Sequence, residues 1–445
     1  TYYYCIVTNT IAENGDGGTK TASTTSSIAK ITVNAQVDTY TITFNANGGS
    51  VSPDSATTVD NKLATLPTPT KSGYRFDGWF TEASGGTPVT TSTVFSANAT
   101  IYAHWAPIDY DYDYTPPKKP IIVDGKTQNI GSEKTNGGTT VINVDQPKLT
   151  EQLGKANDES SVVVPVSANA TATVSLMLKN VEDMAKKNMT LSVKTGGITY
   201  DLPTASVGVA ALAAAFPGQD TAKIPFEVTI KASDVKIDGA TVIVTPVSFT
   251  VSAVYGGESM TVDRFSAFVE RTFEITKAQS EIISTAVVVE SDGTLRHVPT
   301  FVFEKDGKYY ATVKSMTNSV YALIQNEVTF ADAVGKWYED IANEVGSRRI
   351  VIGTDKGTFS GDAKITRAEY ATMMVRALGL PLSKSDSFTD VAANAWYAGY
   401  VATACEHGIV NGIGNNMFNP KGLITRQEAM QMIYNASKLT GFPTL

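Results

Sequence analysis

The chain has 445 residues, which predicts about three domains at roughly 150 residues each. Its 36 Lys and Arg against 44 Asp and Glu give a net charge of −8, and no basic run exceeds two residues, which excludes an electrostatic nucleic-acid-binding surface. Two cysteines and three histidines are too few for a Cys/His metal site or a disulfide framework. No apolar run approaches the ~20 residues of a membrane-spanning helix. We therefore expect no nucleic-acid partner, no membrane span, no metal and no cofactor.

The N-terminal segment, residues 1–36, contains two alternating stretches, residues 1–8 and 28–33, on either side of a turn-rich stretch. A Tyr two residues before a Cys is typical of one corner of an immunoglobulin-like sandwich, so Tyr3 and Cys5 favour the last two strands of such a domain. The partner cysteine is absent, so a surface hairpin with an incidental cysteine explains the segment nearly as well, and Cys5 should be a free thiol. Because the chain starts inside a strand, we expect it to be processed or part of a longer protein.

Residues 37–107 have the pattern of a small β module with Gly-rich turns. Tyr40, Ile42 and Phe44 alternate before a turn at residues 47–49, which predicts a sheet with one buried face. The sequences FNANGGS, GYRFDGW and IYAHW resemble the internalin-type B-repeat (Listeria–Bacteroides repeat) of bacterial surface proteins. This resemblance implies a β-grasp-like spacer without catalytic residues, and we expect His104 to face solvent on a strand.

Residues 108–138 are predicted to be a linker. Asp and Tyr alternate from Asp109 to Tyr114 before a proline-rich stretch, which is typical of a stiff, solvated spacer. The Asp spacing is similar to that of a calcium-binding loop, but Tyr114 stands where such a loop needs Gly and Pro120 where it needs a bidentate Glu. We therefore expect no metal site in this segment.

Residues 139–326 form the largest module, which we predict to be an α+β or sandwich-like domain. Met177, Val181 and Met184 fall at helical spacing and predict an amphipathic helix, and a hairpin around Gly196 and Gly197 follows it. Strict alternation of apolar residues predicts further strands between this hairpin and the end of the module.

Three segments of this module, residues 262–266, 297–300 and 317–321, resemble the β-rich module that often precedes wall-anchoring repeats in secreted proteins of Gram-positive bacteria. This resemblance implies no activity. His297 has no nucleophile or carboxylate in a recognisable motif beside it, so we expect a strand-surface or packing role rather than that of a catalytic base.

An internal repeat covers the C-terminal part of the chain in two units, residues 327–382 and 385–440. Matching residues recur at an offset of 59, or 58 for the first pair. The matched sequences are Phe330-x-Asp332 with Phe388-x-Asp390, Trp337-Tyr338 with Trp396-Tyr397, Gly353 with Gly412, Phe359 with Phe418, and Ile365-Thr366-Arg367-x-Glu369 with Ile424-Thr425-Arg426-x-Glu428. Each unit is predicted to be a helix–loop–helix.

A Thr-x-x-Glu spacing predicts a capping box at the start of the second helix in each unit. The two pairs are Thr366 with Glu369 and Thr425 with Glu428. Capping does not explain the Arg that follows each Thr, because the helix dipole disfavours a cation in the first turn. Arg367 and Arg426 therefore indicate an anion bound at each helix start.

The motifs F-x-D, W-Y, I-x-x-G, F and I-T-R-x-E resemble S-layer homology repeats, the cell-wall anchoring modules of bacterial surface proteins. This resemblance implies non-covalent binding of a secondary cell-wall polysaccharide, typically one with pyruvyl ketals, whose carboxylate a guanidinium recognises bidentately. The implied contacts are Arg367 and Arg426 for the carboxylate, Asp332 and Asp390 for sugar hydroxyls or amides, Trp337 and Trp396 as apolar walls, and Gly353 and Gly412 for close approach of the ligand.

The two units differ at several positions. Ser360-Gly361 stands where the second unit has Asn419-Pro420, Ala368 is replaced by Gln427, and Gly346 stands in the first helix where the second unit has Cys405. We expect Cys405 to be buried as a small apolar residue. Families of this kind usually carry three repeats around a pseudo-threefold axis, so either a third repeat lies outside this chain or one complete groove binds the ligand.

The predicted fold class is thus a multidomain chain of β-rich modules followed by helical repeats. The predicted function is that of a non-enzymatic, secreted protein of the bacterial cell surface or cell wall (S-layer type), with a secondary cell-wall polysaccharide as its partner. The alternative is a self-assembling lattice or filament subunit whose β modules contact other copies, since low charge and many β edges favour such contacts. A wall-associated hydrolase would need paired carboxylates or a nucleophile–base pair, which no motif supplies.

Overall fold

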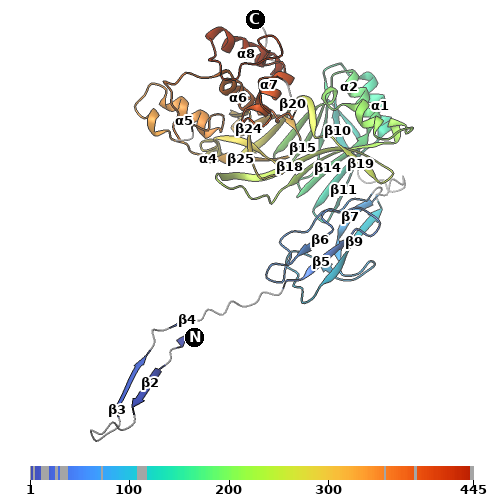
Figure 1. Ribbon diagram of the computed structural model, residues 1–445. Helices are drawn as coiled ribbons and strands as arrows, with labels where there is room; N and C mark the ends of the chain where they lie inside the picture. The colour runs from blue at the N-terminus through green and yellow to red at the C-terminus, as the bar shows by residue number, and fades with distance from the viewer. Residues whose placement is uncertain are drawn as a thin grey trace. The chain divides into compact units, whose positions relative to one another are not determined.

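The computed structural model describes residues 2–3, 6–11, 20–25, 29–30, 39–71, 74–107, 118–354, 357–384 and 388–440. The chain divides into two compact units, Thr1–Ile108 and Asp109–Leu445 (Figure 1). The predictions made for Cys5 and for the Asp/Tyr stretch 109–114 fall outside the described residues.

The N-terminal segment contains two antiparallel pairs of strands. β2 (Ile6–Ile11) pairs with β3 (Lys20–Thr25), and β1 (Tyr2–Tyr3) pairs with β4 (Ala29–Lys30). β1 and β4 lie within the two alternating stretches 1–8 and 28–33, whereas β3 is a further strand that alternation did not indicate. The sequence KTASTT of β3 has no apolar alternation, but its β-branched threonines suit an extended strand.

A five-stranded sheet with the order β6-β5-β9-β7-β8 forms the rest of the first unit. Its strands are β5 (Thr41–Asn45), β6 (Ser55–Thr57), β7 (Tyr74–Phe80), β8 (Pro88–Val89) and β9 (Ala99–Pro107). As alternation predicts, Ile42 and Phe44 are buried, and they share a core with Trp79. His104 is half-buried rather than solvent-facing, because its ring stacks on Phe80 at 4.0 Å and its Nε2 lies 2.8 Å from the carbonyl oxygen of Glu82.

One sheet of sixteen strands is the centre of the second unit. Its strands are β10 (Lys118–Val123), β11 (Lys126–Asn136), β12 (Thr139–Val144), β13 (Ser161–Pro165), β14 (Thr171–Met177), β15 (Thr190–Thr195), β16 (Ile198–Pro203), β17 (Pro225–Ala232), β18 (Thr241–Tyr255), β19 (Glu258–Thr261), β20 (Arg264–Ile275), β21 (Thr285–Val289), β22 (Leu295–Val298), β23 (Thr300–Lys305), β24 (Lys308–Thr317) and β25 (Val320–Gln325). Their order is β22-β21-β25-β18-β17-β14-β12-β11-β10-β13-β15-β16-β20-β24-β23, with β19 paired to β18.

The two ends of this sheet are consecutive in the chain. Only Pro299 separates β22 from β23, so the sheet has to curl until its ends approach each other. The backbone N–H of Lys314 in β24 donates to the carbonyl of Pro299 at 3.0 Å and fixes this crossing. Side chains from strands all around the sheet, from Ile121 to Leu323, fill one apolar core as a result.

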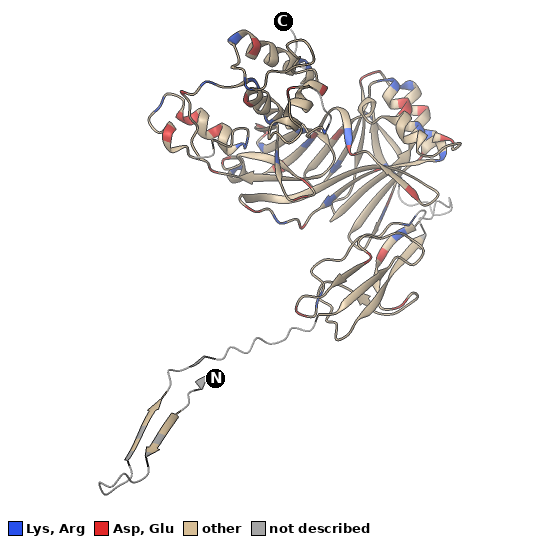
Figure 2. Ribbon diagram, in the orientation of Figure 1, with Lys and Arg blue, Asp and Glu red and all other residues tan. Residues whose placement is uncertain are grey.

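Short helices accompany the sheet: α1 (Gln146–Lys155), α2 (Leu178–Lys186), α3 (Val209–Ala214) and α4 (Lys277–Ser280), with 3-10 turns at Thr204–Ser206 and Thr221–Lys223. The predicted amphipathic helix is α2, and it buries Val181 and Met184. Figure 2 shows that charged residues gather on α1 and α2, whereas the strands carry few. The salt bridge between Lys186 and Glu182 lies on this solvated face.

Residues 118–136 form strands, although we predicted a linker up to residue 138. β10 and β11 lie inside the large sheet, where β10 pairs with β11 and β13. Ile121 and Val123 on β10 are buried. Composition did not predict this strand because it starts with Lys-Lys-Pro, and prolines and charges are depleted in strands.

The two repeats follow the sheet. The first contains a 3-10 turn at Ala331–Ala333, α5 (Glu339–Ser347) and α6 (Arg367–Ala377), and the second contains α7 (Ala398–Glu406) and α8 (Arg426–Leu439). Both repeats are helix–loop–helix units, as predicted. Cys405 is half-buried at the edge of their shared core rather than buried.

The repeats pack directly against the end of the sheet. The side chain of Arg296 on β22 donates to the carbonyl of Gly379, which follows α6. Gly379 has a φ of +61°, and a Cβ there would lie 2.7 Å from the carbonyl oxygen of His297. Met316 of β24 belongs to the core of the repeats. This part of the sheet and the repeats therefore share a close-packed joint.

His297 lies within this joint. It is only 4% exposed, and its Nδ1 lies 2.8 Å from Oγ1 of Thr285. Burial, with a smaller contribution from the charge of Arg348, lowers the pKa of His297 to about 4. Of the two roles expected for this residue, the structure assigns packing.

Acidification is expected to weaken the joint through His297. Since its pKa is about 4 in the folded chain and about 6.5 when unfolded, the unfolded chain binds more protons between these values, and stability falls as the pH drops from 6.5 towards 4. The full effect is about 3 kcal/mol. Unfolding measured across this range should show a steeper decline for the natural chain than for the His297→Asn variant, and identical slopes would contradict the assignment.

Candidate functional site

In each repeat an aspartate accepts hydrogen bonds from the backbone of later loop residues. Asp332 accepts hydrogen bonds from the backbone N–H groups of Phe359 and Ser360 at 2.9 and 2.7 Å, and these bonds lower its pKa. Asp390 accepts the two equivalent bonds at 2.8 and 2.7 Å. Both carboxylates therefore have a role inside their repeats. A contact with sugar hydroxyls would have to use their remaining lone pairs, and it stays a prediction.

The two matched glycines lie where the phenylalanine of the same repeat packs. A Cβ at Gly412 would stand 2.7 Å from the carbonyl oxygen of Met417 and 2.8 Å from Cε1 of Phe388. At Gly353, where φ is +86°, a Cβ would stand 3.0 Å from Cε1 of Phe330. Internal packing therefore explains both glycines, which is a different reason from the ligand approach implied by the resemblance.

Trp337 and Trp396 present their rings to solvent, with exposed fractions of 90% and 60%. Each indole packs edge-on against the tyrosine that follows it, with ring centroids 5.5 and 5.3 Å apart. The rings are thus oriented by a neighbour and remain accessible. Their predicted role as apolar walls for a sugar is compatible with this placement and stays a prediction.

Both predicted capping boxes are present. Oγ1 of Thr366 accepts from the backbone N–H of Glu369 at 3.2 Å, and Glu369 accepts from the backbone N–H of Thr366 at 2.7 Å. Thr425 and Glu428 form the same pair of bonds at 3.3 and 2.8 Å. The boxes fix the first turns of α6 and α8, from which the two arginines extend.

The structure corrects the role predicted for Arg367, which does not face a ligand. It is 5% exposed, and its guanidinium donates to Oε1 of Glu428 at 2.5 Å, to the carbonyl of Phe418 at 3.0 Å and to the carbonyl of Asn411 at 3.4 Å. It also lies over the ring of Phe418 at 4.9 Å. The anion expected at this helix start is therefore a carboxylate of the second repeat.

The start of α6 is held by the second repeat through its backbone as well. The N–H groups of Arg367 and Ala368 donate to the carbonyls of Gly422 and Pro420 at 2.8 and 3.1 Å. Glu428 serves both the capping box of α8 and the ion pair, and the Thr425 hydrogen bonds contribute most to its lowered pKa. The two repeats are thus joined by charge, backbone bonds and a shared core.

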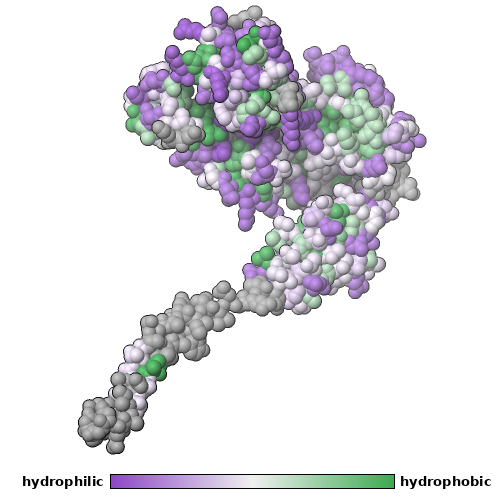
Figure 3. Space-filling view, viewed as in Figure 1, coloured by the Kyte–Doolittle hydropathy of each residue, from purple (hydrophilic) through white to green (hydrophobic). Residues whose placement is uncertain are grey.

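Arg426 occupies the equivalent position on α8 in a different environment. Its side chain is exposed, and its guanidinium has no hydrogen bond or ion pair within the part of the chain that the structure describes. The same helix face exposes Met430 (60%) and Tyr434 (48%), whereas the residues 59 positions earlier on α6 are fully buried. Figure 3 shows apolar residues scattered among polar ones on the surface of this C-terminal region.

Protein-family models match the chain within the two repeat units that the sequence motifs predicted. Residues 329–371 and 387–430 match the S-layer homology domain, and residues 40–104 match the Listeria-Bacteroides repeat domain. The chain carries two S-layer homology domains. The resemblances to the B-repeat and to S-layer homology repeats are confirmed, with the helical repeats at the C-terminal side of the β modules. The resemblance stated for segments between residues 262 and 321 stays a prediction.

Relatives share a limited part of the chain. A surface layer protein of Brevibacillus choshinensis is 31% identical over 152 residues, which cover 31% of this chain and 14% of that protein. An S-layer protein of Bacillus anthracis is 37% identical over 114 residues (25% and 14%), and an amylopullulanase of Thermoanaerobacterium thermosulfurigenes is 32% identical over 122 residues (27% and 6%). The chain thus spans at most about a seventh of these proteins.

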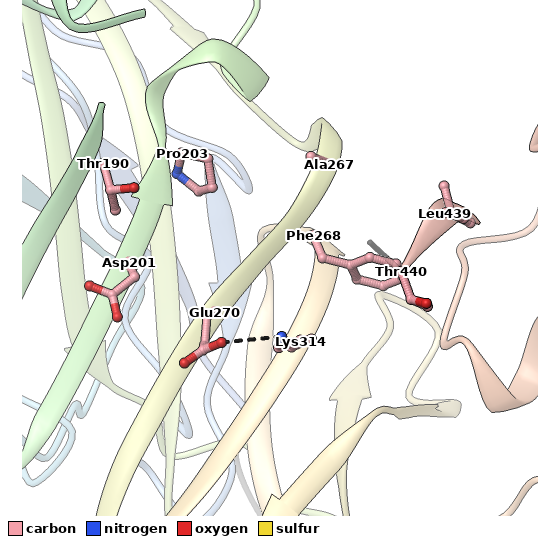
Figure 4. Close-up of a pocket in the computed structure, with 9 residues that line it drawn as sticks. All are labelled: Thr190, Asp201, Pro203, Ala267, Phe268, Glu270, Lys314, Leu439 and Thr440. Atoms are coloured by element: carbon pink, nitrogen blue, oxygen red, sulfur yellow. Dashed lines mark ion pairs between the residues drawn. The ribbon is translucent and has the colours of Figure 1, made fainter. Parts of the chain in front are cut away.

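A cleft of about 510 Å³ separates the end of α8, beyond the matched residues 387–430, from the sheet (Figure 4). Its charged residues are Asp201, Glu270 and Lys314, and Phe268 forms part of its wall. Glu270 pairs with Lys314 at 3.4 Å, and Asp201 accepts from Oγ of Ser192 at 2.5 Å. Both carboxylates are therefore engaged by neighbours.

None of the described helices has the length and apolar character needed to cross a bilayer.

Proposed function

We propose that this chain is a cell-surface protein held non-covalently to an acidic secondary cell-wall polysaccharide by its S-layer homology domains. The two matched domains and the names of relatives described as surface layer proteins support this function. The ligand class is a polymer with carboxylate groups, such as pyruvyl ketals, because a planar carboxylate fits a guanidinium in two-pronged geometry.

One observation carries this proposal: Arg426 presents a guanidinium where Arg367 holds a carboxylate. Both side chains extend from the first turn of a helix that begins with a Thr-x-x-Glu capping box. Arg367 meets Oε1 of Glu428 at 2.5 Å, whereas the described residues offer Arg426 no anion. At Arg367 the guanidinium is paired with a carboxylate of the protein, and at Arg426 a ligand carboxylate would form the equivalent pair. Trp396 of the same repeat offers an exposed ring to the ligand.

The proposed function is not enzymatic. Some relatives with this domain are named as glycosidases, such as the amylopullulanase, but the match covers 6% of that protein. The carboxylates in the cleft, Asp201 and Glu270, are each engaged by a neighbouring side chain. A glycosidase needs one carboxyl free as an acid and one as a base or nucleophile.

Changing Arg426 to Lys is expected to weaken binding to the pyruvylated polymer by about one to two decades, because Lys keeps the charge but loses the two-pronged geometry. Binding of the full chain to purified wall polysaccharide, by calorimetry or co-sedimentation, measures this change. Lys421→Gln is the matched control, since it removes an exposed cation of the same repeat outside α8. Its effect should be small and should vanish at high salt.

The polymer supplies a second control. After chemical removal of pyruvate, the natural chain and the Arg426→Lys variant should bind equally. If the variant loses as much affinity for the stripped polymer as for the native one, Arg426 does not recognise the ketal carboxylate. If the natural chain does not bind the native polymer at all, the proposed function of these two domains is wrong.

A further inference from the structure

The two terminal strands of the large sheet differ in whether other parts of the chain cover them. β22, at one end, is covered by the first repeat, since α6 packs on it and Arg296 reaches Gly379. β23, at the other end, pairs only with β24, and no other strand among the described residues lies against its free side. An open edge of this kind is a template for another strand.

The backbone groups at this edge can be assigned. Asp306 and Gly307 have φ values of +53° and +74° and form the two-residue turn between β23 and β24. In such a hairpin Lys305 and Lys308 bond each other, so the N–H and C=O groups of every second residue, including Phe303, face β24. Those of Val302 and Glu304 face outward.

An independent contact agrees with this alternation. The carbonyl of Thr300, two residues before Val302, accepts a hydrogen bond from Nη1 of Arg348 at 3.2 Å, on the side away from β24. This bond occupies the outward carbonyl of Thr300 at one end of the edge. Beyond Thr300, four outward backbone groups of β23 have no partner among the described residues, the N–H and C=O of Val302 and of Glu304.

The side chains of the edge form an aromatic row. Phe301 is 68% exposed, and its ring stacks on Phe303 with centroids 5.7 Å apart. Phe303 stacks across the hairpin on Tyr310 at 5.5 Å. Val302 points to the opposite face and packs against the core. The aromatic part of the edge, residues 300–303, contains neither a charge nor a proline, and the residues that usually protect an exposed edge, Pro299, Glu304 and Lys305, lie on either side of it.

We propose that β23 is an interface for a second copy of this chain, which pairs with it in antiparallel orientation about a twofold axis at Phe303. In this register Val302 lies opposite Glu304 of the second copy, and Glu304 opposite Val302. The pairing uses all four free backbone groups of each strand and leaves the bond between Arg348 and Thr300 intact.

The side chains also fit this register. Phe303 lies directly opposite its equivalent in a non-hydrogen-bonded pair, where side chains are closest, so the two rows of rings join across the axis. Phe301 lies opposite Lys305 of the second copy, a cation–aromatic pair. An unrelated strand would satisfy the backbone groups, but self-pairing also aligns the rings, and a twofold contact of identical surfaces is the commonest form of self-association. With four hydrogen bonds in all between the two strands, the contact is small and we expect it to be weak.

Cysteine crosslinking of the full chain tests the register. In a background of Cys5→Ser and Cys405→Ala, the Phe303→Cys variant should form a covalent dimer on mild oxidation, because opposed residues in such a pair have Cα atoms about 4.5 Å apart, within disulfide range. The Phe301→Cys variant is the matched control. Its two equivalent positions would be four residues apart along the strands, about 13 Å, so it should not crosslink.

The Glu304→Pro change tests the backbone pairing. It removes an outward N–H that is not used inside the fold, so the melting temperature should change little, whereas the dimer fraction in sedimentation and the crosslinking of Phe303→Cys should fall about tenfold or more. Equal crosslinking of the Phe301→Cys and Phe303→Cys variants overturns the proposal. So does the absence of any Phe303→Cys dimer, or crosslinking that persists with Glu304→Pro.

Discussion

The Arg367→Ala variant is expected to lose about 3 kcal/mol of stability in its repeats. The natural guanidinium is 5% exposed and bonds Glu428 and two carbonyls of the second repeat. Removing it takes the Arg367 donor away from Oε1 of Glu428 and from both carbonyls, and opens a cavity over the ring of Phe418. Hydrogen exchange of the α6 and α8 amides in the full chain, measured at rising denaturant, reports this loss.

Arg426→Ala is the control, because it removes the same side chain from the same position of the second repeat. Its exposed guanidinium has no partner among the described residues, so stability should change by less than about 0.5 kcal/mol. Equal losses for the two variants would show that the contacts of Arg367 do not hold the repeats together.

Gly379→Ala is expected to cost about 3 kcal/mol and to separate the unfolding of the repeats from that of the sheet. The residue has a φ of +61°, which is strained for Ala, and the added Cβ would stand 2.7 Å from the carbonyl oxygen of His297 and 2.8 Å from Cα of Val298. Because backbone surrounds this position, relief requires the joint to open. Calorimetry should then resolve an additional transition, and proteases should cut near residues 379–384.

Gly408→Ala isolates the backbone part of this effect. Gly408 follows α7 with a φ of +66°, and nothing lies within 4 Å of a Cβ placed there. We expect a cost of about 1 kcal/mol without any splitting of the transition. A cost for Gly379→Ala no larger than that for Gly408→Ala would contradict a tight joint.

Features that depend on neighbours in sequence could be predicted from the sequence. The capping boxes need only a Thr and a Glu three residues apart, and the strands of the first sheet need only alternation. The repeat offset also identified both matched S-layer homology domains. The roles of Arg367 and Arg426 could not be separated, because their motifs are identical and only the second repeat, lying against α6, distinguishes them.

The same limit explains the errors in the β modules. Residues 118–136 contain lysines and a proline, and their place in the sheet depends on pairing with β13, a strand from a distant part of the sequence. For His297 the sequence left a surface role and a packing role open, because its burial results from the repeats packing over β22. The offset of 59 did contain one missed signal: Ala371 and Val375 align with Met430 and Tyr434, and the small residues mark the face that is covered.

The joint around Gly379 has a mechanical consequence for the anchoring proposed above. The sheet leads into the first repeat over a few residues after β25, and Arg296 and Arg348 cross between the two parts. A pull on the sheet is therefore shared by several contacts of the joint instead of being taken up by a slack tether.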